Sequence, residues 1–85
     1  MSNIIELEPN SIHSVVIDNK FIIVHAETKN ENEISEVELI INDKLNESIS
    51  IRKGVKYIEK NLQVSGELKI INKGPSTINL IISFL

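Results

Sequence analysis

Hydrophobic and polar residues alternate along most of this chain of 85 residues. In residues 34–41, Val37 and Leu39 alternate with Glu36 and Glu38, which is the two-residue period of a strand with one buried face. Short polar segments rich in Asn, Asp, Gly, Pro and Ser separate such runs. The pattern predicts strands at residues 3–7, 12–17, 20–27, 34–41, 48–52, 68–71 and 76–85.

The connections between these strands follow from turn-forming residues. Asp18-Asn19 stands between two strong strand runs and predicts a tight hairpin, because both residues tolerate left-handed backbone conformations. The other predicted connections are residues 8–11, 28–33, 42–47, 64–67 and 72–76. Residues 54–63 remain ambiguous, since Val55 and Tyr57 alternate as in a strand whereas Val55, Ile58 and Leu62 could line a helical face.

Seven or eight short strands predict an all-β fold, a small antiparallel β-sandwich of jelly-roll or related topology. The chain has 17 Ile and 6 Val but a single Ala, and stiff β-branched side chains favour strands over helices. Its length suits one domain, residues 1–85.

Composition narrows the cellular setting. The chain has no Cys and its first residues lack the pattern of a signal peptide, so we expect synthesis in the cytoplasm and no disulfide framework. No apolar run approaches the roughly 18 residues of a spanning helix, so we expect no membrane partner. The net charge of −3 disfavours nucleic acid as a general partner.

One basic group is a candidate site for an anion: Arg52, Lys53, Lys56 and Lys60. Clustered cations of this kind also occur in proteins that bind single-stranded nucleic acid, where aromatic rings between them stack on bases. Here Tyr57 is the one aromatic residue available. Nucleic-acid binding is therefore the weakest of the functional hypotheses.

The two histidines provide a test for a metal site. A three-residue loop at 18–20 would place His13 opposite His25, whereas a two-residue loop would place them on opposite faces. Neither case supplies a third ligand at a diagnostic spacing, and the acidic residues of 31–43 lack a calcium-loop pattern. No catalytic motif occurs either, so we expect no metal, no cofactor and no enzymatic activity.

Several strands are apolar on both faces, which a two-layer sandwich of this size cannot bury by itself. In the last strand Ile78, Leu80, Ile82 and Phe84 form the predicted core face. The opposite face, together with outward positions of other strands, predicts an interface between copies of the chain. Its predicted residues are Ile22, Val24, Ile40, Ile71, Ile81 and Leu85.

The closing segment INLIISFL and the spacing of the strands resemble the jelly-roll modules of trimeric TNF/C1q-like proteins and of small viral or phage structural proteins. The resemblance implies a subunit that assembles by burying its sheet faces, in a virion if the viral likeness holds. We therefore expect a non-enzymatic structural subunit that works as a homo-oligomer. The alternative is a module that recognises another protein or a carbohydrate.

Overall fold

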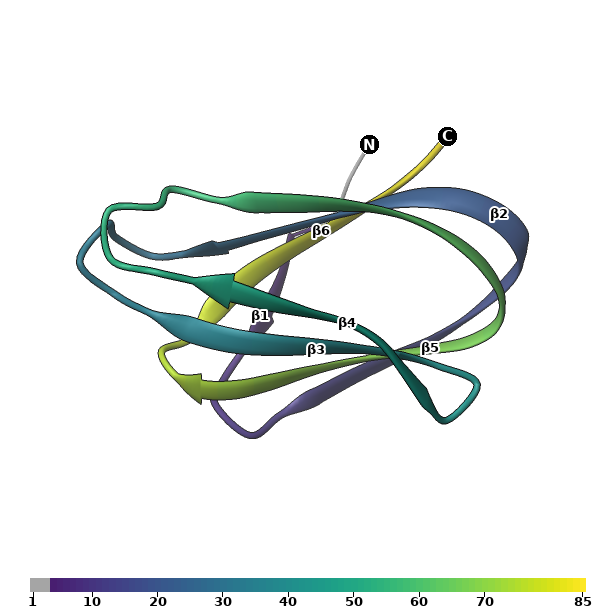
Figure 1. Ribbon diagram of the computed structural model, residues 1–85, viewed down its shortest axis with the longest axis horizontal. Helices are drawn as coiled ribbons and strands as arrows, with labels where there is room; N and C mark the ends of the chain where they lie inside the picture. The colour runs from purple at the N-terminus through teal and green to yellow at the C-terminus, as the bar shows by residue number, and fades with distance from the viewer. Residues whose placement is uncertain (1–3) are drawn as a thin grey trace.

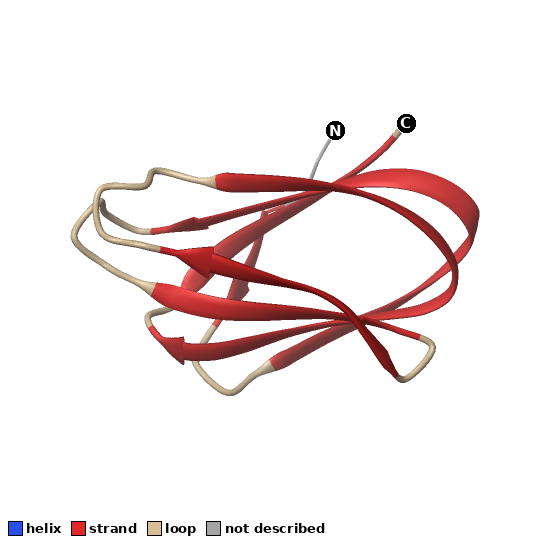
Figure 2. Ribbon diagram, in the orientation of Figure 1, coloured by secondary structure: helices blue, strands red, loops and turns tan. Residues whose placement is uncertain are grey.

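The structure is a computed structural model that describes residues 4–85, so Asn3, the predicted start of the first strand, lies outside the described residues. Figure 2 shows strands joined by loops, with no helix in the described part of the chain. No segment within residues 4–85 therefore forms a helix that could span a membrane. The strands are β1 (Ile4–Leu7), β2 (Ile12–Thr28), β3 (Ser35–Ile41), β4 (Lys44–Ile51), β5 (Ile58–Pro75) and β6 (Ile78–Phe84).

All neighbouring strands are antiparallel, in the order β1-β6-β2-β5-β3-β4. The long strands β2 and β5 pair with each other and curve together at the right-hand end of Figure 1, which folds the sheet into two layers. The first layer contains β1, β6, residues 20–28 and residues 58–64; the second contains residues 12–17, residues 66–75, β3 and β4. The predicted all-β antiparallel sandwich is confirmed.

The number of strands is lower than predicted because two expected turns lie inside continuous strands. Residues 18–19 lie inside β2, and residues 64–67 lie inside β5. Ile17 pairs with Gly66 and Lys20 with Val64, so Asp18 and Asn19 form a bulge in β2. The predicted hairpin at Asp18-Asn19 is therefore wrong, although Asn19 does adopt a left-handed φ of 45°. A bulge increases the local bend and twist of a strand, which here turns both strands from one layer into the other.

The bend of β5 is held by the turn between β3 and β4. Asn42 and Asp43 have φ of 50° and 67° and form this two-residue turn, shorter than the predicted connection 42–47. The Asn42 Nδ2 donates to the Ser65 carbonyl at 2.9 Å, and its Oδ1 accepts from the Glu67 amide at 3.0 Å. A Cβ at Gly66 would lie 2.1 Å from that Oδ1, so glycine is required at this contact.

The remaining boundaries differ modestly from the sequence-based prediction. Residues 54–63 contain no helix, since a loop ends at Tyr57 and β5 begins at Ile58. At the other end β5 continues to Pro75 through a cis Gly74–Pro75 peptide bond, so the predicted turn 72–76 is mostly strand.

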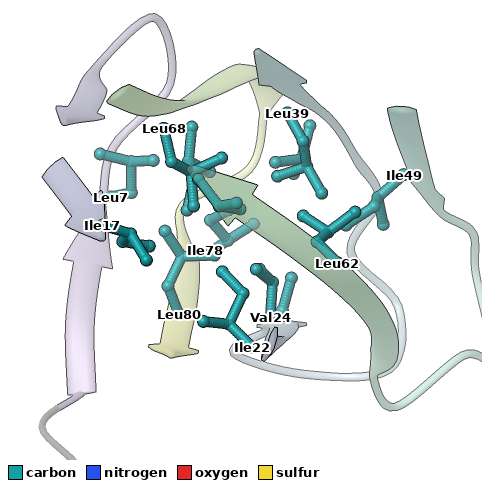
Figure 3. Close-up of a cluster of buried hydrophobic side chains, with 14 of the residues drawn as sticks. Leu7, Ile17, Ile22, Val24, Leu39, Ile49, Leu62, Leu68, Ile78 and Leu80 are labelled. Atoms are coloured by element: carbon teal, nitrogen blue, oxygen red, sulfur yellow. The ribbon is translucent and has the colours of Figure 1, made fainter. Parts of the chain in front are cut away.

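The core lies between the layers and is almost wholly aliphatic (Figure 3). Ile22 and Val24 have 0% exposure and point into it, so their prediction as interface residues is wrong. In residues 21–26 both sides of the strand carry apolar residues, so the sequence pattern did not indicate which side packs against the second layer. In β6, Ile78 and Leu80 are buried as predicted, whereas Phe84 at the end of the strand is 57% exposed.

Asn72 is the most deeply buried of the polar residues in the described part of the chain, ahead of Ser35 and Thr28. Asn72 has 0% exposure, and its Nδ2 donates to the carbonyl oxygens of Leu7 at 2.9 Å and Ser76 at 2.8 Å. Its Oδ1 accepts from Ser35 Oγ at 2.6 Å and from the Gly74 amide at 2.9 Å. The amide thus makes four hydrogen bonds and joins β1, β3 and the turn after β5, which offsets the cost of burying it.

Replacing Asn72 with Ala should lower the free energy of unfolding by about 2–4 kcal/mol, because it leaves buried partners unsatisfied. Urea denaturation at fixed protein concentration measures this change. Asn46→Ala, at an exposed position of β4, is the matched control and should change stability by less than about 0.5 kcal/mol. Equal losses in the two variants would contradict the role assigned to Asn72.

Two glycines with left-handed backbone provide a second test. Gly54 has φ of 89° with open space around its Cβ position, whereas Gly66 has φ of 124° and is closed by Asn42. Gly54→Ala should cost about 1–2 kcal/mol of unfolding free energy from backbone strain alone. Gly66→Ala should cost at least about twice as much, because the Asn42 clamp must also move; equal costs in urea denaturation would argue against the clamp.

Candidate interaction surfaces

The outward side of the first layer carries a contiguous apolar surface, here called the apolar face. Its members come from three adjacent strands and the residue that follows β6: Ile4, Phe21, Ile23, Ile81 and Leu85. Ile4, Phe21 and Leu85 are 65%, 59% and 75% exposed, and the other two are half-buried. Soluble proteins seldom leave such a group of large aliphatic and aromatic side chains uncovered.

The strand register explains why these side chains are neighbours. Ile4 lies directly opposite Ile81 in the pairing of β1 with β6. Leu85 donates its amide to the Phe21 carbonyl at 3.0 Å, so these two lie side by side where β6 ends. Ile23 pairs with Ser83 and is therefore diagonal to Ile81 across the two strands. Ile23 thus connects the pair Ile4–Ile81 with the pair Phe21–Leu85. The face therefore runs across β1, β6 and β2, and none of its side chains carries a formal charge.

A polar cluster borders the apolar face on the side of β5. His25 pairs with Ile81 on β6 and with Glu59 on β5. Its Nδ1 lies 3.1 Å from a Glu59 carboxylate oxygen, and its Nε2 lies 3.8 Å from Glu27. The Tyr57 ring stacks on the imidazole with centroids 4.8 Å apart and an interplanar angle of 18°. The carboxylates and the stacked ring together fix the orientation of His25.

An ion pair closes the same end of the layer. Lys29 Nζ lies 2.8 Å from a Glu6 carboxylate oxygen and connects the end of β2 to β1. The hydrogen bond and charge of Glu6 raise the pKa of Lys29 above its ordinary value, so Lys29 stays charged throughout the physiological range. Glu6 and Lys29 thus lie at the His25 end of the first layer, whereas Lys20, which is exposed, precedes Phe21 at the other end.

The outward side of the second layer, here called the mixed face, has a different character. It carries two apolar pairs, Ile71 opposite Ile12 and Ile40 opposite Leu45, and the charged residues Lys69 and Glu38 lie between the pairs. Lys69 Nζ lies 3.3 Å from Asp43 and 3.6 Å from Glu67, and these partners raise the pKa of Lys69, Asp43 most strongly. These charged side chains of the mixed face are therefore paired with one another.

The six predicted interface residues therefore fall in three places. Ile22 and Val24 are core, Ile40 and Ile71 lie on the mixed face, and Ile81 and Leu85 lie on the apolar face. The apolar face also contains Ile4, Phe21 and Ile23, which were not among the predicted interface residues. The alternation in residues 21–26 contained a signal for Phe21 and Ile23, since they occupy the side opposite Ile22 and Val24, but Ile4 had no distinguishing pattern.

The structure also divides the predicted basic group. Lys56 lies 3.6 Å from Glu31, and Lys60 lies 3.9 Å from Glu47. Arg52 and Lys53 follow the end of β4 and border a cavity that contains neither Lys56 nor Lys60.

The two histidines do not meet. His13 pairs with Ile70 in the second layer, whereas His25 lies in the first, because β2 passes through its bulge between them. Among residues 4–85 no group of three or more His, Cys, Asp or Glu side chains has the geometry to hold a metal ion.

No protein-family model matches the sequence, and no curated protein matches it. Among solved structures, the nucleoplasmin-like N-terminal domain of Drosophila FKBP39 superposes with a TM-score of 0.74 at 14% identity, covering 99% of this chain and 87% of that one. The carbohydrate-binding module CBM36 in complex with calcium and xylotriose superposes with a TM-score of 0.49 at 18% identity, covering 94% of this chain and 78% of that one. The CBM36-1 domain of a multidomain xylanase from the hindgut metagenome of Trinervitermes trinervoides superposes with a TM-score of 0.48 at 13% identity, covering 99% of this chain and 82% of that one. The first likeness shows a shared fold, the nucleoplasmin-like sandwich.

The His25–Tyr57 stack can be tested with an optical signal, because Tyr57 is the one tyrosine of a chain without tryptophan. Fixing an aromatic ring in an asymmetric setting produces near-ultraviolet circular dichroism. His25→Ala should remove most of the signal in the tyrosine region while far-ultraviolet dichroism is retained. His13→Ala is the matched control and should leave the tyrosine signal unchanged; an equal loss in both variants would argue against the stack.

Proposed function

We propose that this protein is a non-enzymatic structural subunit that assembles with copies of itself through the apolar face. The observation that carries the proposal is the contiguous group of five uncharged apolar side chains on the outward side of the first layer. Burying their exposed parts against a second copy would contribute on the order of 5 kcal/mol before the cost of association. A closed assembly covers this face on each copy.

A second copy suits the distribution of charge on this layer. The acidic residues Glu27 and Glu59 lie at the His25 end, whereas Phe21 and Leu85 lie at the other end, where no acidic residue pairs with them. Two copies that pack through the ends that carry Phe21 and Leu85 keep the acidic residues of their His25 ends apart. Like charges brought together would oppose association.

The other surfaces favour this assignment. On the mixed face Lys69 is paired with Asp43 and Glu67, so covering it would require desolvating satisfied charges. Lys56 and Lys60 each lie beside a carboxylate, which weakens the alternative of a nucleic-acid surface across residues 52–60. The apolar face carries no comparable cost of burial.

Ile81→Asp should dissociate the assembly, because it places a charge in the centre of the apolar face. Multi-angle light scattering at micromolar concentration should give a multiple of 9.6 kDa for the unmodified protein and the monomer mass for the variant. Circular dichroism should show unchanged strand content. Phe21→Asp, at a more exposed position, should have the same effect.

Val16→Asp is the matched control, since Val16 is 78% exposed and lies on the mixed face. It should leave the mass in solution unchanged. A monomeric unmodified protein at micromolar concentration would overturn the proposal. Dissociation by Val16→Asp and not by Ile81→Asp would assign assembly to the other face.

A further inference from the structure

A cavity of about 360 Å³ opens where β3 begins and β4 and β5 end, on the second layer. Its apolar wall is formed by Ile34, Ile51 and Pro75. Arg52 and Lys53, which follow β4 directly, supply the charged part of its lining. The volume is at the lower end of the range for small-molecule sites, and the combination of an apolar wall with a few placed charges is typical of them.

The hydrogen-bond network of Asn72 positions the wall of this cavity. Ser35, another lining residue, donates its hydroxyl hydrogen to Asn72 Oδ1 at 2.6 Å, and its Oγ also lies 3.1 Å from the Ser76 carbonyl oxygen. Ser35 pairs with Pro75 on one side and with Ile51 on the other. The hydrogen bonds of Asn72 therefore fix the positions of these three lining residues relative to one another. The site is therefore largely pre-formed, which reduces the entropy lost on binding a ligand.

The turn that carries the two cations is also held in place. The Val55 amide donates to the Arg52 carbonyl at 3.0 Å, and the Gly54 amide donates to the Glu31 carbonyl at 2.7 Å. The second of these bonds ties the loop after β4 to the loop before β3, and the two loops lie side by side at the left-hand end of Figure 1. Arg52 and Lys53 thus project from a constrained turn.

The charges of the lining add up to one positive charge. Neither Arg52 nor Lys53 forms an ion pair with any residue of the described range 4–85. Glu36, the acidic lining residue, accepts a hydrogen bond from Ser50 Oγ at 2.8 Å. Two cations and one carboxylate balance a single negative charge on a ligand, and the guanidinium of Arg52 suits a planar carboxylate.

We propose that this cavity binds a small organic monoanion, a carboxylate attached to a compact apolar body. The carboxylate lies between Arg52 and Lys53, and the apolar body lies against Ile34, Ile51 and Pro75. The net charge of the lining disfavours a phosphate dianion. The cavity lies on the second layer, so this binding is independent of assembly through the apolar face.

Hexanoate, titrated into the isotope-labelled full chain and followed by two-dimensional amide NMR, tests the proposal. Saturable shifts in the millimolar range should concentrate on residues 34–36 and 51–53. Hexanamide has the same apolar body without the charge and should bind at least fivefold more weakly. Inorganic phosphate should cause no saturable shift at these amides.

The variant Arg52→Gln with Lys53→Gln should raise the dissociation constant for hexanoate at least tenfold. Both side chains are exposed, and a retained amide spectrum verifies that the variant is folded. Lys44→Gln, at the other end of β4, is the matched control and should leave the affinity unchanged. Absence of saturable shifts, equal binding of hexanoate and hexanamide, or equal losses in the Lys44 variant would each overturn the proposal.

Discussion

The buried amide of Asn72 is the interaction on which the arrangement of this sandwich depends. An aliphatic core specifies little about which strands end where, because one buried isoleucine packs much like another. An amide with four hydrogen bonds is specific, since a shift in any partner leaves a polar group unsatisfied inside the core. It joins β1, β3 and the turn before β6, so the edge of one layer and the centre of the other are fixed at a common point.

The same constraint connects the core to both candidate surfaces. The turn that Asn72 holds at Ser76 leads directly into β6, and β6 carries Ile81 into the apolar face. The hydrogen bond from Ser35 to Asn72 fixes Ser35, which lines the cavity beside Arg52. The surfaces lie on different layers, so each can be occupied without the other. The proposed assembly and the proposed ligand binding therefore use different surfaces of one scaffold.

The bulge of β2 and the bend of β5 opposite it account for the two layers and their different outer faces. A single sheet with this many apolar positions would expose one whole side; bending it through Asp18-Asn19 and Gly66 buries that side against itself. The outer side of each half remains exposed. In the first layer its apolar side chains form one contiguous group, whereas in the second layer Lys69 and Glu38 divide them into the pairs Ile12–Ile71 and Ile40–Leu45. The shared fold with a nucleoplasmin-like domain indicates that 14% identity is sufficient for this architecture.

The sequence by itself determined the fold class, because alternation and a supply of Ile and Val leave little besides an antiparallel sandwich. It also indicated that the apolar surface exceeds what one small core can bury. The tertiary structure decided which side of each doubly apolar strand faces inward, and so moved Ile22 and Val24 from the interface to the core. It also separated the cations of residues 52–60 into paired lysines and the two that border a cavity. The physical reason is that strand period fixes relative facing within a strand, whereas long-range pairing and bulges fix the absolute facing and the neighbours of each side chain.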